Sequence, residues 1–232
     1  MASKWDSLQK QLLQSLDCEL KGYAFKLKMS DWAYRRPTLY GFDLIRISFS
    51  TYRDLCTDAL PSVGLRHEEI CRIVNPHTNN WDEKQKKVNL VVGSGIKYQI
   101  TDSSNSRWSL QSQDDIAPAV AGIMHLVHNF AFPYFERFSS LEEILDVCAS
   151  RDQSKAFNSA SEVRPAFALA AAYLIGDRDR YNSVLADLTD YIESVPIFND
   201  TGNTTFYAVA ADLEQRWKAK ESGAGNLSTG TI

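Results

Sequence analysis

The sequence lacks the spacings by which most catalytic, metal-binding and nucleotide-binding sites are recognised. Its 232 residues contain no Walker, Rossmann, GxSxG or HExxH pattern. The four cysteines are scattered and include no CxxC pair, which is typical of reduced thiols in a cytoplasmic core and not of a disulfide framework. We therefore expect no cofactor, no metal site and no catalytic residue of a familiar type.

Long apolar runs are also missing, since none approaches the roughly 20 residues that a transmembrane helix needs. The most apolar stretch, Ala166–Ile175, is short and alanine-rich, which favours a buried helix. Near the start, Trp5 and Asp6 interrupt the segment where a signal peptide needs an apolar core. We expect a cytoplasmic protein that does not associate with membranes.

The composition is that of an ordinary globular protein, with 44% hydrophobic and 23% charged residues. The formal net charge of −4 is unevenly distributed. Residues 1–112 carry 16 Lys or Arg and 12 Asp or Glu, whereas the remainder carries 9 and 17. A basic half followed by an acidic half does not favour general attraction to nucleic acid, which usually requires a strongly basic patch.

The first half changes from a helical period to an alternating one. Apolar residues recur at three- and four-residue steps from Trp5 to Leu20, and Gly22 is placed for a left-handed helix cap. In the stretch Leu39–Tyr52 the apolar residues from Ile45 onward share one strand face, whereas Phe42 and Leu44 would lie on the other. This change of face near Leu44 allows either a bulge or a strand with both faces partly covered. Alternation predicts strands at Tyr23–Met29, Leu39–Tyr52, Val63–Leu65, Val88–Val92, Ile96–Ile100 and Arg107–Leu110, with Gly93-Ser94-Gly95 as a hairpin turn and a helix at His67–Val74.

The second half is predicted to be helical. Asp115 is expected to cap a helix that Pro133 interrupts, and Ser140-Leu-Glu-Glu143 has the form of a capping box. Further helices are expected at 165–175, 179–194 and 205–220, before a disordered tail at 221–232. The fold class is therefore α+β: an N-terminal helix and a mostly antiparallel sheet, followed by a C-terminal helical bundle. One domain is expected over 1–220, with halves at 1–112 and 113–220.

Two pairs of residues could carry chemistry. On the predicted helix, His67 and Cys71 are four residues apart and could form a thiolate–imidazole pair, although Cys71 is also in phase with the core. His125 and His128 have a spacing compatible with metal binding, but the helical period directs them towards solvent. In both cases a structural or solvated role is favoured.

Basic residues interleaved with tyrosines on the first strands form a stronger candidate. If they project from one exposed sheet face, this face could receive an acidic partner or, less readily, nucleic acid. The favoured alternative is a solvated sheet face, or one that pairs with the acidic helices of the second half. The candidate binding residues are Lys26, Lys28, Arg35, Arg36, Tyr40, Arg46, Tyr52 and Arg53.

Two segments resemble a bacterial domain-of-unknown-function family numbered 4304. They are Gly22-Tyr-Ala-Phe25, followed by Trp32 and Arg35, and Phe132-Pro-Tyr-Phe135, followed by Ser140–Leu145. The resemblance covers about the first two-thirds of the chain. It implies an N-terminal helix, an antiparallel sheet and a helix leading to the aromatic-proline segment, without catalytic residues.

Proteins of this kind are often regarded as immunity partners of bacterial toxins. Our leading hypothesis is accordingly a non-enzymatic protein-binding module, an immunity-type inhibitor of a toxin domain, whose acidic helical half could meet a basic toxin surface. Whether the sheet or the acidic helical half is the contact surface stays open at this point. The alternatives are an enzyme with an unrecognised site around His67 and Cys71, or an RNA-binding module on the basic sheet face.

Overall fold

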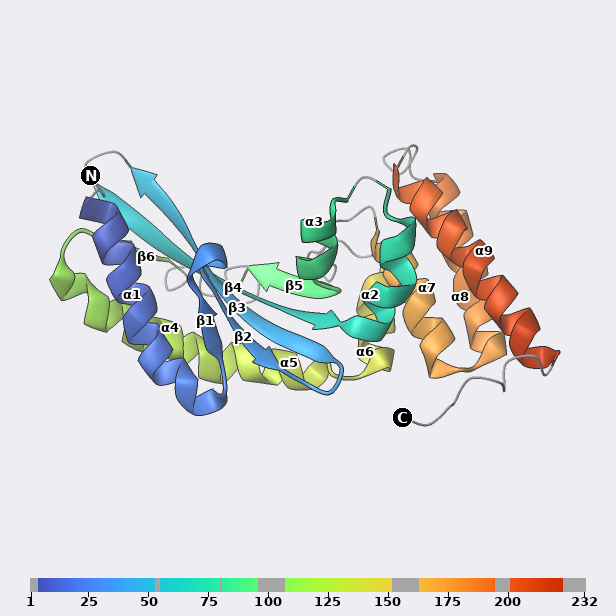
Figure 1. Cartoon of the computed structure of the whole chain (residues 1–232), viewed down its shortest axis with the longest axis horizontal. Helices are drawn as coiled ribbons and strands as arrows, with labels where there is room; N and C mark the ends of the chain where they lie inside the picture. Colours follow the sequence, from blue (N-terminus) through green and yellow to red (C-terminus); the bar gives the residue numbers. More distant parts are fainter. Residues whose placement is uncertain are drawn as a thin grey trace. The chain divides into compact units, whose positions relative to one another are not determined.

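The chain folds into a six-stranded antiparallel sheet and a set of helices, which Figure 1 shows in chain order. The computed structural model describes residues 4–52, 55–79, 81–95, 107–151, 163–194 and 201–222, with the backbone alone at 201–203. Contacts divide the chain into two units: unit 1 comprises Met1–His67 and Leu90–Ser140, and unit 2 comprises Glu68–Asn89 and Leu141–Ile232. The single domain over 1–220 stays a prediction, and each unit is described by itself.

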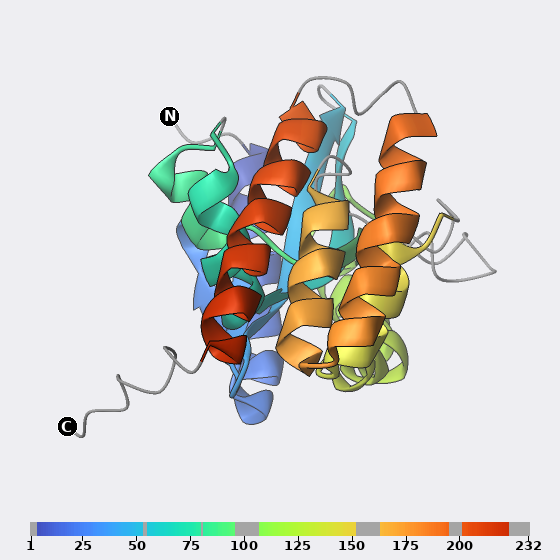
Figure 2. The same cartoon turned by 90° about the vertical axis from the view of Figure 1, so that its right-hand side faces the viewer.

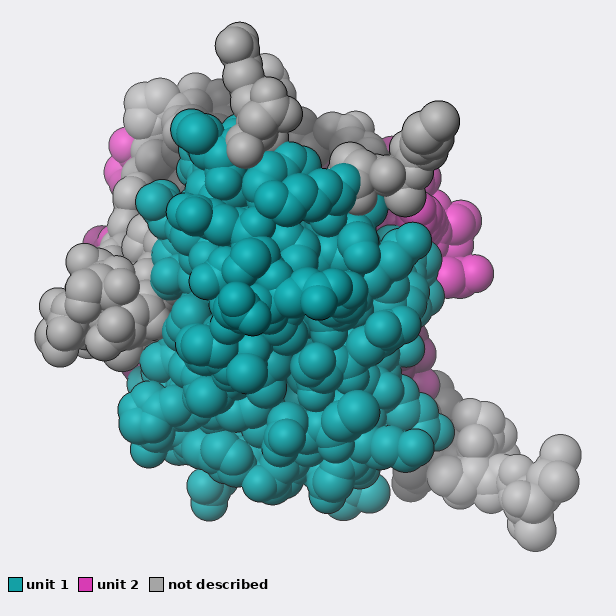
Figure 3. Space-filling view, turned by 90° about the vertical axis from the view of Figure 1, so that its left-hand side faces the viewer, with its two compact units in different colours: residues 1–67, 90–140 teal, residues 68–89, 141–232 magenta. Residues whose placement is uncertain are grey.

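Unit 1, coloured teal in Figure 3, contains the sheet and the helices that pack on it. The strand order is β1-β2-β3-β4-β5, with β6 pairing β4 at the same edge as β5. The strands are β1 (Lys26–Lys28), β2 (Ala33–Pro37), β3 (Gly41–Tyr52), β4 (Cys56–His67), β5 (Val92–Gly95) and β6 (Trp108–Leu110). The helical segments of unit 1 are α1 (Lys4–Leu20), η1 (Lys21–Tyr23), η2 (Met29–Asp31), η6 (Gln113–Asp115), α4 (Ile116–Leu126), η7 (Val127–Ala131) and α5 (Phe132–Arg137).

Helix α1 covers one face of the sheet. Its apolar stripe, predicted from the sequence, is buried, and the helix contacts β1, β3, β4 and α4. Two polar side chains fix its position: Tyr34 donates from Oη to the backbone oxygen of Leu13 at 2.6 Å, and Gln9 donates to Thr57 Oγ1 at 3.0 Å. Because Tyr34, Ile45 and Val63 face one another across the ladders, they form the core-facing side.

Several sequence predictions for unit 1 are wrong in detail. The left-handed residue after α1 is Ala24, with φ 64°, and Gly22 belongs to η1. Gly93-Ser94-Gly95 is not a turn but lies within β5, paired with Gly64, Val63 and Ser62 of β4. Val88 ends a helix, and residues 96–100 of the predicted hairpin lie outside the described residues.

The alternatives at Leu44 are resolved in favour of a strand covered on both faces. Strand β3 pairs with β4 without interruption from Gly41 to Tyr52, so no bulge is present there. Leu44 is only 1% exposed although it lies opposite to the core-facing side. Leu90 packs directly against Gly64, which neighbours Leu44 on that face. A Cβ on Gly64 would lie only 2.5 Å from Leu90 Cδ1, so the side chain of Leu90 covers the strand there.

Pro133 does not end the helix that precedes it. The helical run continues from Gln113 to Arg137 through the π-turn η7, which lies just before Pro133. A π-turn displaces the local hydrogen bonds, so that a proline without an N–H can be accommodated. The cap also differs from the prediction, because Ser112 caps the N-terminus at Gln113 and the Asp115 carboxylate accepts from the backbone N–H of Ser112 at 2.8 Å.

By length and composition the same helical run, Gln113–Arg137, could cross a membrane, and 33% of its apolar window is buried in the fold. One helix of this kind is weak evidence for a membrane span, because core helices of soluble proteins pass the same test. Among the described residues, no second helix meets both criteria.

Unit 2 is built around one helix that is buried on all sides. Helix α7 contacts α2, α6, α8 and α9, and every residue from Arg164 to Tyr173 is buried. An all-round apolar helix is expected to occupy such a central position, and Figure 2 shows α7 between α8 and α9. The elements are α2 (Glu68–Val74), η3 (Asn75–His77), α3 (Glu83–Val88), α6 (Leu141–Ala149), α7 (Arg164–Ile175), α8 (Arg178–Ser194) and α9 (Thr201–Glu221).

The α+β class is confirmed, with an N-terminal helix and an antiparallel sheet before the C-terminal helices. The helices expected at 165–175, 179–194 and 205–220 are α7, α8 and α9, and Gly176 takes the left-handed conformation after α7 with φ 87°. Of the predicted disordered tail, Glu221 ends α9, and 223–232 lie outside the described residues.

Candidate binding surface

Four basic side chains gather on the face of the sheet opposite to α1. Lys26 of β1 lies directly opposite Arg35 of β2, and Lys28 and Arg46 both lie opposite Ala33. Side chains that face each other across a ladder project to the same side. Because Arg35 and Ala33 are two residues apart on β2, all four basic residues share one side, which we call the cationic face.

One carboxylate partly neutralises the cationic face. Asp31 in η2 forms ion pairs with Lys28 at 2.9 Å and with Arg35 at 2.8 Å. The pKa of Asp31 is lowered, chiefly by the hydrogen bond from Lys28, and desolvation opposes this shift. The sequence analysis missed Asp31, although its spacing of three and four residues from these cations was the available signal.

The remaining donors of the cationic face are unsatisfied. Within the described part of the chain, neither Lys26 nor the guanidinium of Arg46 forms an ion pair or a hydrogen bond. The Nε atoms of Arg35 and Arg46 are shielded from solvent and have no acceptor among the residues that the structure describes. Because these two atoms are out of reach of a partner, an anionic group placed here would pair with the exposed Lys26 and with the terminal guanidinium nitrogens of Arg46.

Arg36 and Tyr40 do not belong to this surface, contrary to the prediction. Arg36 follows Arg35 on the strand and therefore projects to the opposite side, where it donates from Nε and Nη2 to Asp43 Oδ2 at 2.9 and 2.6 Å. Tyr40 donates to the other oxygen of Asp43 and stacks on His67, with the ring centroids 5.9 Å apart. Burial, followed by the bond to Asp43, raises the pKa of Tyr40.

The contacts of Arg36 show a structural role. Its guanidinium lies over three aromatic rings, 4.9 Å from the centroid of Phe25, 5.6 Å from that of Phe132 and 5.5 Å from that of Phe135. The aromatic-proline segment, Phe132–Phe135, thus covers the ion pair between Arg36 and Asp43, and the Asp43 carboxylate is only 1% exposed. An arginine held by both cation–π contacts and a carboxylate is not available to a partner.

The last two predicted residues do not extend the cationic face. Tyr52 is exposed and lies on the same side as Arg46, but six residues further along β3, which is about 20 Å in a strand. Arg53 lies outside the described residues. The candidate surface is therefore reduced to Lys26, Lys28, Arg35 and Arg46.

Of the two candidate pairs, His67 and Cys71 do not have the predicted arrangement, whereas His125 and His128 are exposed, as predicted. His67 is the last residue of β4 and not part of the helix that carries Cys71, so the four-residue helical spacing does not apply. His125 and His128 are exposed; His125 contacts Asn129, whereas His128 packs against Tyr23 and Phe132. Among the described residues, no group of three His, Cys, Asp or Glu side chains could hold a metal ion.

Comparisons with family models, with curated proteins and with solved structures gave no match for this chain. The cationic face therefore has to be interpreted from its own geometry and charge.

Proposed function

We propose that this chain is a non-enzymatic protein-binding module that receives an acidic surface of its partner on the cationic face. The observation that carries the proposal is the grouping of four cations on one face with a single carboxylate, Asp31, which pairs with Lys28 and Arg35; among the described residues, Lys26 and the Arg46 guanidinium have no ion pair. Carboxylates of a partner would pair with Lys26 and Arg46 and would relieve the repulsion between Lys26 and Arg35. In line with the resemblance described above, we propose a bacterial, cytoplasmic immunity-type inhibitor that binds a toxin domain.

An acidic protein partner is favoured over RNA by the extent of the charge. The cationic face has four basic residues, and the whole chain has a net charge of −4, whereas nucleic-acid-binding domains are usually strongly basic. An enzyme is less favoured because Cys71 is buried and His67 is largely buried beneath the Tyr40 ring. A thiolate or imidazole in such positions is not open to a substrate.

Co-expression with the product of the neighbouring gene tests the proposal. If that product is a toxin, the chain should co-purify with it and restore growth of the cells. The double variant Lys26→Glu/Arg46→Glu should lose both effects, because it places carboxylates opposite those of the partner. The double variant Lys10→Glu/Lys21→Glu is the matched control, since both lysines are exposed on α1 and η1 and lie outside the cationic face.

Two results would contradict the proposal. One is growth that does not depend on the chain; the other is equal protection by both double variants. Binding to a single-stranded RNA that weakens steeply with salt, and that is lost in Lys26→Glu/Arg46→Glu, would instead support the RNA-binding alternative.

A further inference from the structure

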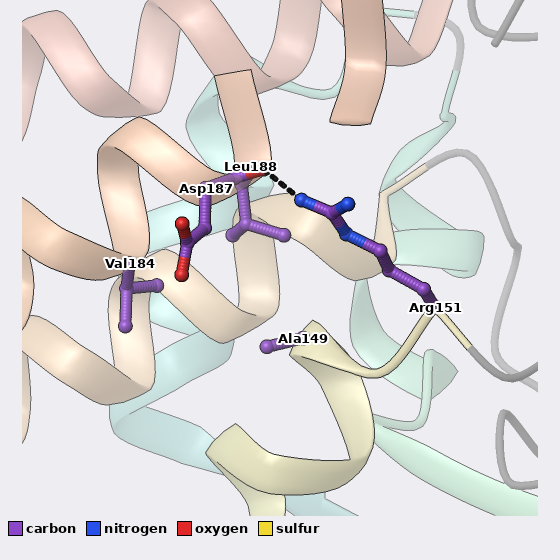
Figure 4. Close-up of a pocket in the computed structure, with 5 residues that line it drawn as sticks. All are labelled: Ala149, Arg151, Val184, Asp187 and Leu188. Carbon is purple, nitrogen blue, oxygen red and sulfur yellow. Dashed lines mark hydrogen bonds between the residues drawn. The ribbon is translucent and has the colours of Figure 1, made fainter. Parts of the chain in front are cut away.

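A hollow lies in unit 2 between the end of α6 and the middle of α8. It consists of two adjoining cavities of about 220 and 310 Å³, both lined by Ala149 and Val184. Figure 4 shows Val184, Asp187 and Leu188 of α8 facing Ala149 across the smaller cavity. With Leu145 of α6, these aliphatic side chains give the hollow an apolar floor.

The rim of the hollow is polar and includes two free carboxylates. Asp187 lines one cavity and Asp146 the other, and both residues are exposed. Within the described chain, neither carboxylate forms an ion pair or accepts a hydrogen bond. The hollow also lies at the C-terminal end of α6, where the helix dipole favours a positive charge.

The two arginines of the rim do not neutralise these carboxylates. Arg151 donates from Nη2 to the backbone oxygen of Asp187 at 3.2 Å, as drawn in Figure 4, and its guanidinium lies over the ring of Tyr191 at 5.7 Å. Arg180 is exposed and forms no ion pair with Asp146 or Asp187 in the described structure. The carboxylates therefore keep their capacity to bind a further cation.

We propose that this hollow binds an arginine side chain presented by a partner protein. The aliphatic stem would cover the apolar floor, and the guanidinium would donate to Asp187 and Asp146 at the rim. Each cavity, at about 220 and 310 Å³, is near the lower limit of roughly 300 Å³ for pockets that bind drug-sized ligands, and an extended side chain is of that size. This site goes beyond the function proposed above and does not depend on the cationic face.

Titration of the full-length, ¹⁵N-labelled chain with two blocked tripeptides tests the proposal. The first is acetyl-Leu-Arg-Leu-amide, and the second replaces arginine by citrulline, which has nearly the same shape but no charge. The arginine peptide should shift the amide resonances of Ala149, Val184 and Leu188, and the citrulline peptide should leave them unchanged. Equal shifts with both peptides, or shifts confined to other acidic surfaces, would overturn the proposal.

A pair of variants separates binding in the hollow from general attraction to acidic helices. Asp187→Asn should weaken binding of the arginine peptide about tenfold, the loss expected for one charge-assisted hydrogen bond. Asp190→Asn, one turn further along α8 and outside the hollow, should change the affinity less than twofold. The same loss in both variants would show that the peptide binds by overall charge and would refute the site.

Discussion

Lys26 lies directly opposite Arg35 across the β1–β2 ladder, so two like charges are immediate neighbours on one face of the sheet. Directly opposed like charges destabilise a sheet, and Asp31 compensates Arg35 but makes no ion pair with Lys26. Lys26 also belongs to a three-residue edge strand, where exposed lysines discourage pairing with the edge of another chain. Its charge is therefore expected to reduce the stability of the isolated protein.

Replacing Lys26 by Gln should raise the free energy of unfolding by about 0.2–1 kcal/mol, because the opposed charges are removed. The gain should largely disappear in 1 M salt, where the Debye length is about 3 Å. Urea unfolding at low and high salt measures both effects, with Lys10→Gln on the exposed side of α1 as control. If Lys26→Gln instead lowers the stability at low salt, the charges of Lys26 and Arg35 do not repel each other in the folded protein.

Replacing Asp43 by Asn should be among the most destabilising changes on the sheet. Asp43 is 1% exposed and accepts hydrogen bonds from Arg36 and Tyr40. Its neutralisation leaves the Arg36 guanidinium, whose side chain is 28% exposed, without a counter-charge and weakens its hydrogen bonds, so a loss of about 1.5–3 kcal/mol is expected. Chemical unfolding measures the change.

Asp31→Asn is the matched control for the Asp43 variant. It removes a carboxylate from a more exposed ion pair, so about 1 kcal/mol or less is expected. Equal losses in the two variants would mean that Arg36 is stabilised by its three aromatic neighbours and not by Asp43.

The helices could be predicted from the sequence because their signals are local. The apolar stripe of α1 and the glycine after α7 follow from the period of 3.6 residues and from the need for a left-handed residue at a helix end. The π-turn before Pro133 could not be predicted in this way. It depends on the packing that holds α4 and α5 in one run, which overrides the tendency of proline to end a helix.

The sheet was predicted less well because its pairing is not local. A proline disfavours a long central strand, yet β4 extends through Pro61. Pro61 lies between the segments that pair with β6 and with β5, so no hydrogen bond to those strands is lost there. Only the positions of β5 and β6 along β4 make this proline acceptable.

Part of the candidate site could have been predicted more accurately. Consecutive residues of a strand point to opposite faces, so Arg35 and Arg36 cannot share one. The register that places Lys26 beside Arg35, and Lys28 and Arg46 around Ala33, is set by pairing in three dimensions. The sequence analysis could therefore identify the basic residues but not which of them form one surface.

The capping carboxylate of Asp115 should give the stability of the protein a measurable pH dependence. Hydrogen bonds from the backbone N–H groups of Gln111 and Ser112 lower the pKa of Asp115 below its ordinary value of 3.8. The folded state therefore binds this proton less tightly than the unfolded state does. The stabilisation is present above pH 3.8 and is lost as the pH falls through the lower pKa of the folded state.

Asp115→Asn should accordingly lower the free energy of unfolding by about 1 kcal/mol at pH 7. The difference in free energy of unfolding between the variant and the unmodified protein should become smaller as the pH falls below 3.8. Asp114→Asn changes the adjacent exposed carboxylate, which makes no side-chain hydrogen bond in the described structure, and should show little of this dependence. Urea unfolding between pH 2.5 and 7, values chosen to span the transition, measures both variants. A constant difference across that range would contradict the assigned role of Asp115.

Two buried tyrosines that differ in one hydrogen bond allow the last prediction. Tyr34 and Tyr181 are both fully buried. The hydroxyl of Tyr34 donates to the backbone oxygen of Leu13, whereas that of Tyr181 has no hydrogen-bond partner in the described part of the chain. Removing the Tyr34 hydroxyl leaves the carbonyl of Leu13 without this donor. Removing the Tyr181 hydroxyl, which makes no such bond, eliminates the free-energy cost of burying an unpaired polar group.

Tyr34→Phe should therefore lower the free energy of unfolding by about 1 kcal/mol, and Tyr181→Phe should leave it unchanged or raise it by a similar amount. Both changes delete one oxygen and keep the ring, so the packing of the two sites is conserved and the comparison isolates the hydrogen bond. Urea unfolding of the two variants, followed by far-UV circular dichroism, gives the values. If Tyr181→Phe destabilises the protein as much as Tyr34→Phe does, the Tyr181 hydroxyl must have an acceptor in solution, and a buried water molecule between the helices of unit 2 would be the first candidate to locate.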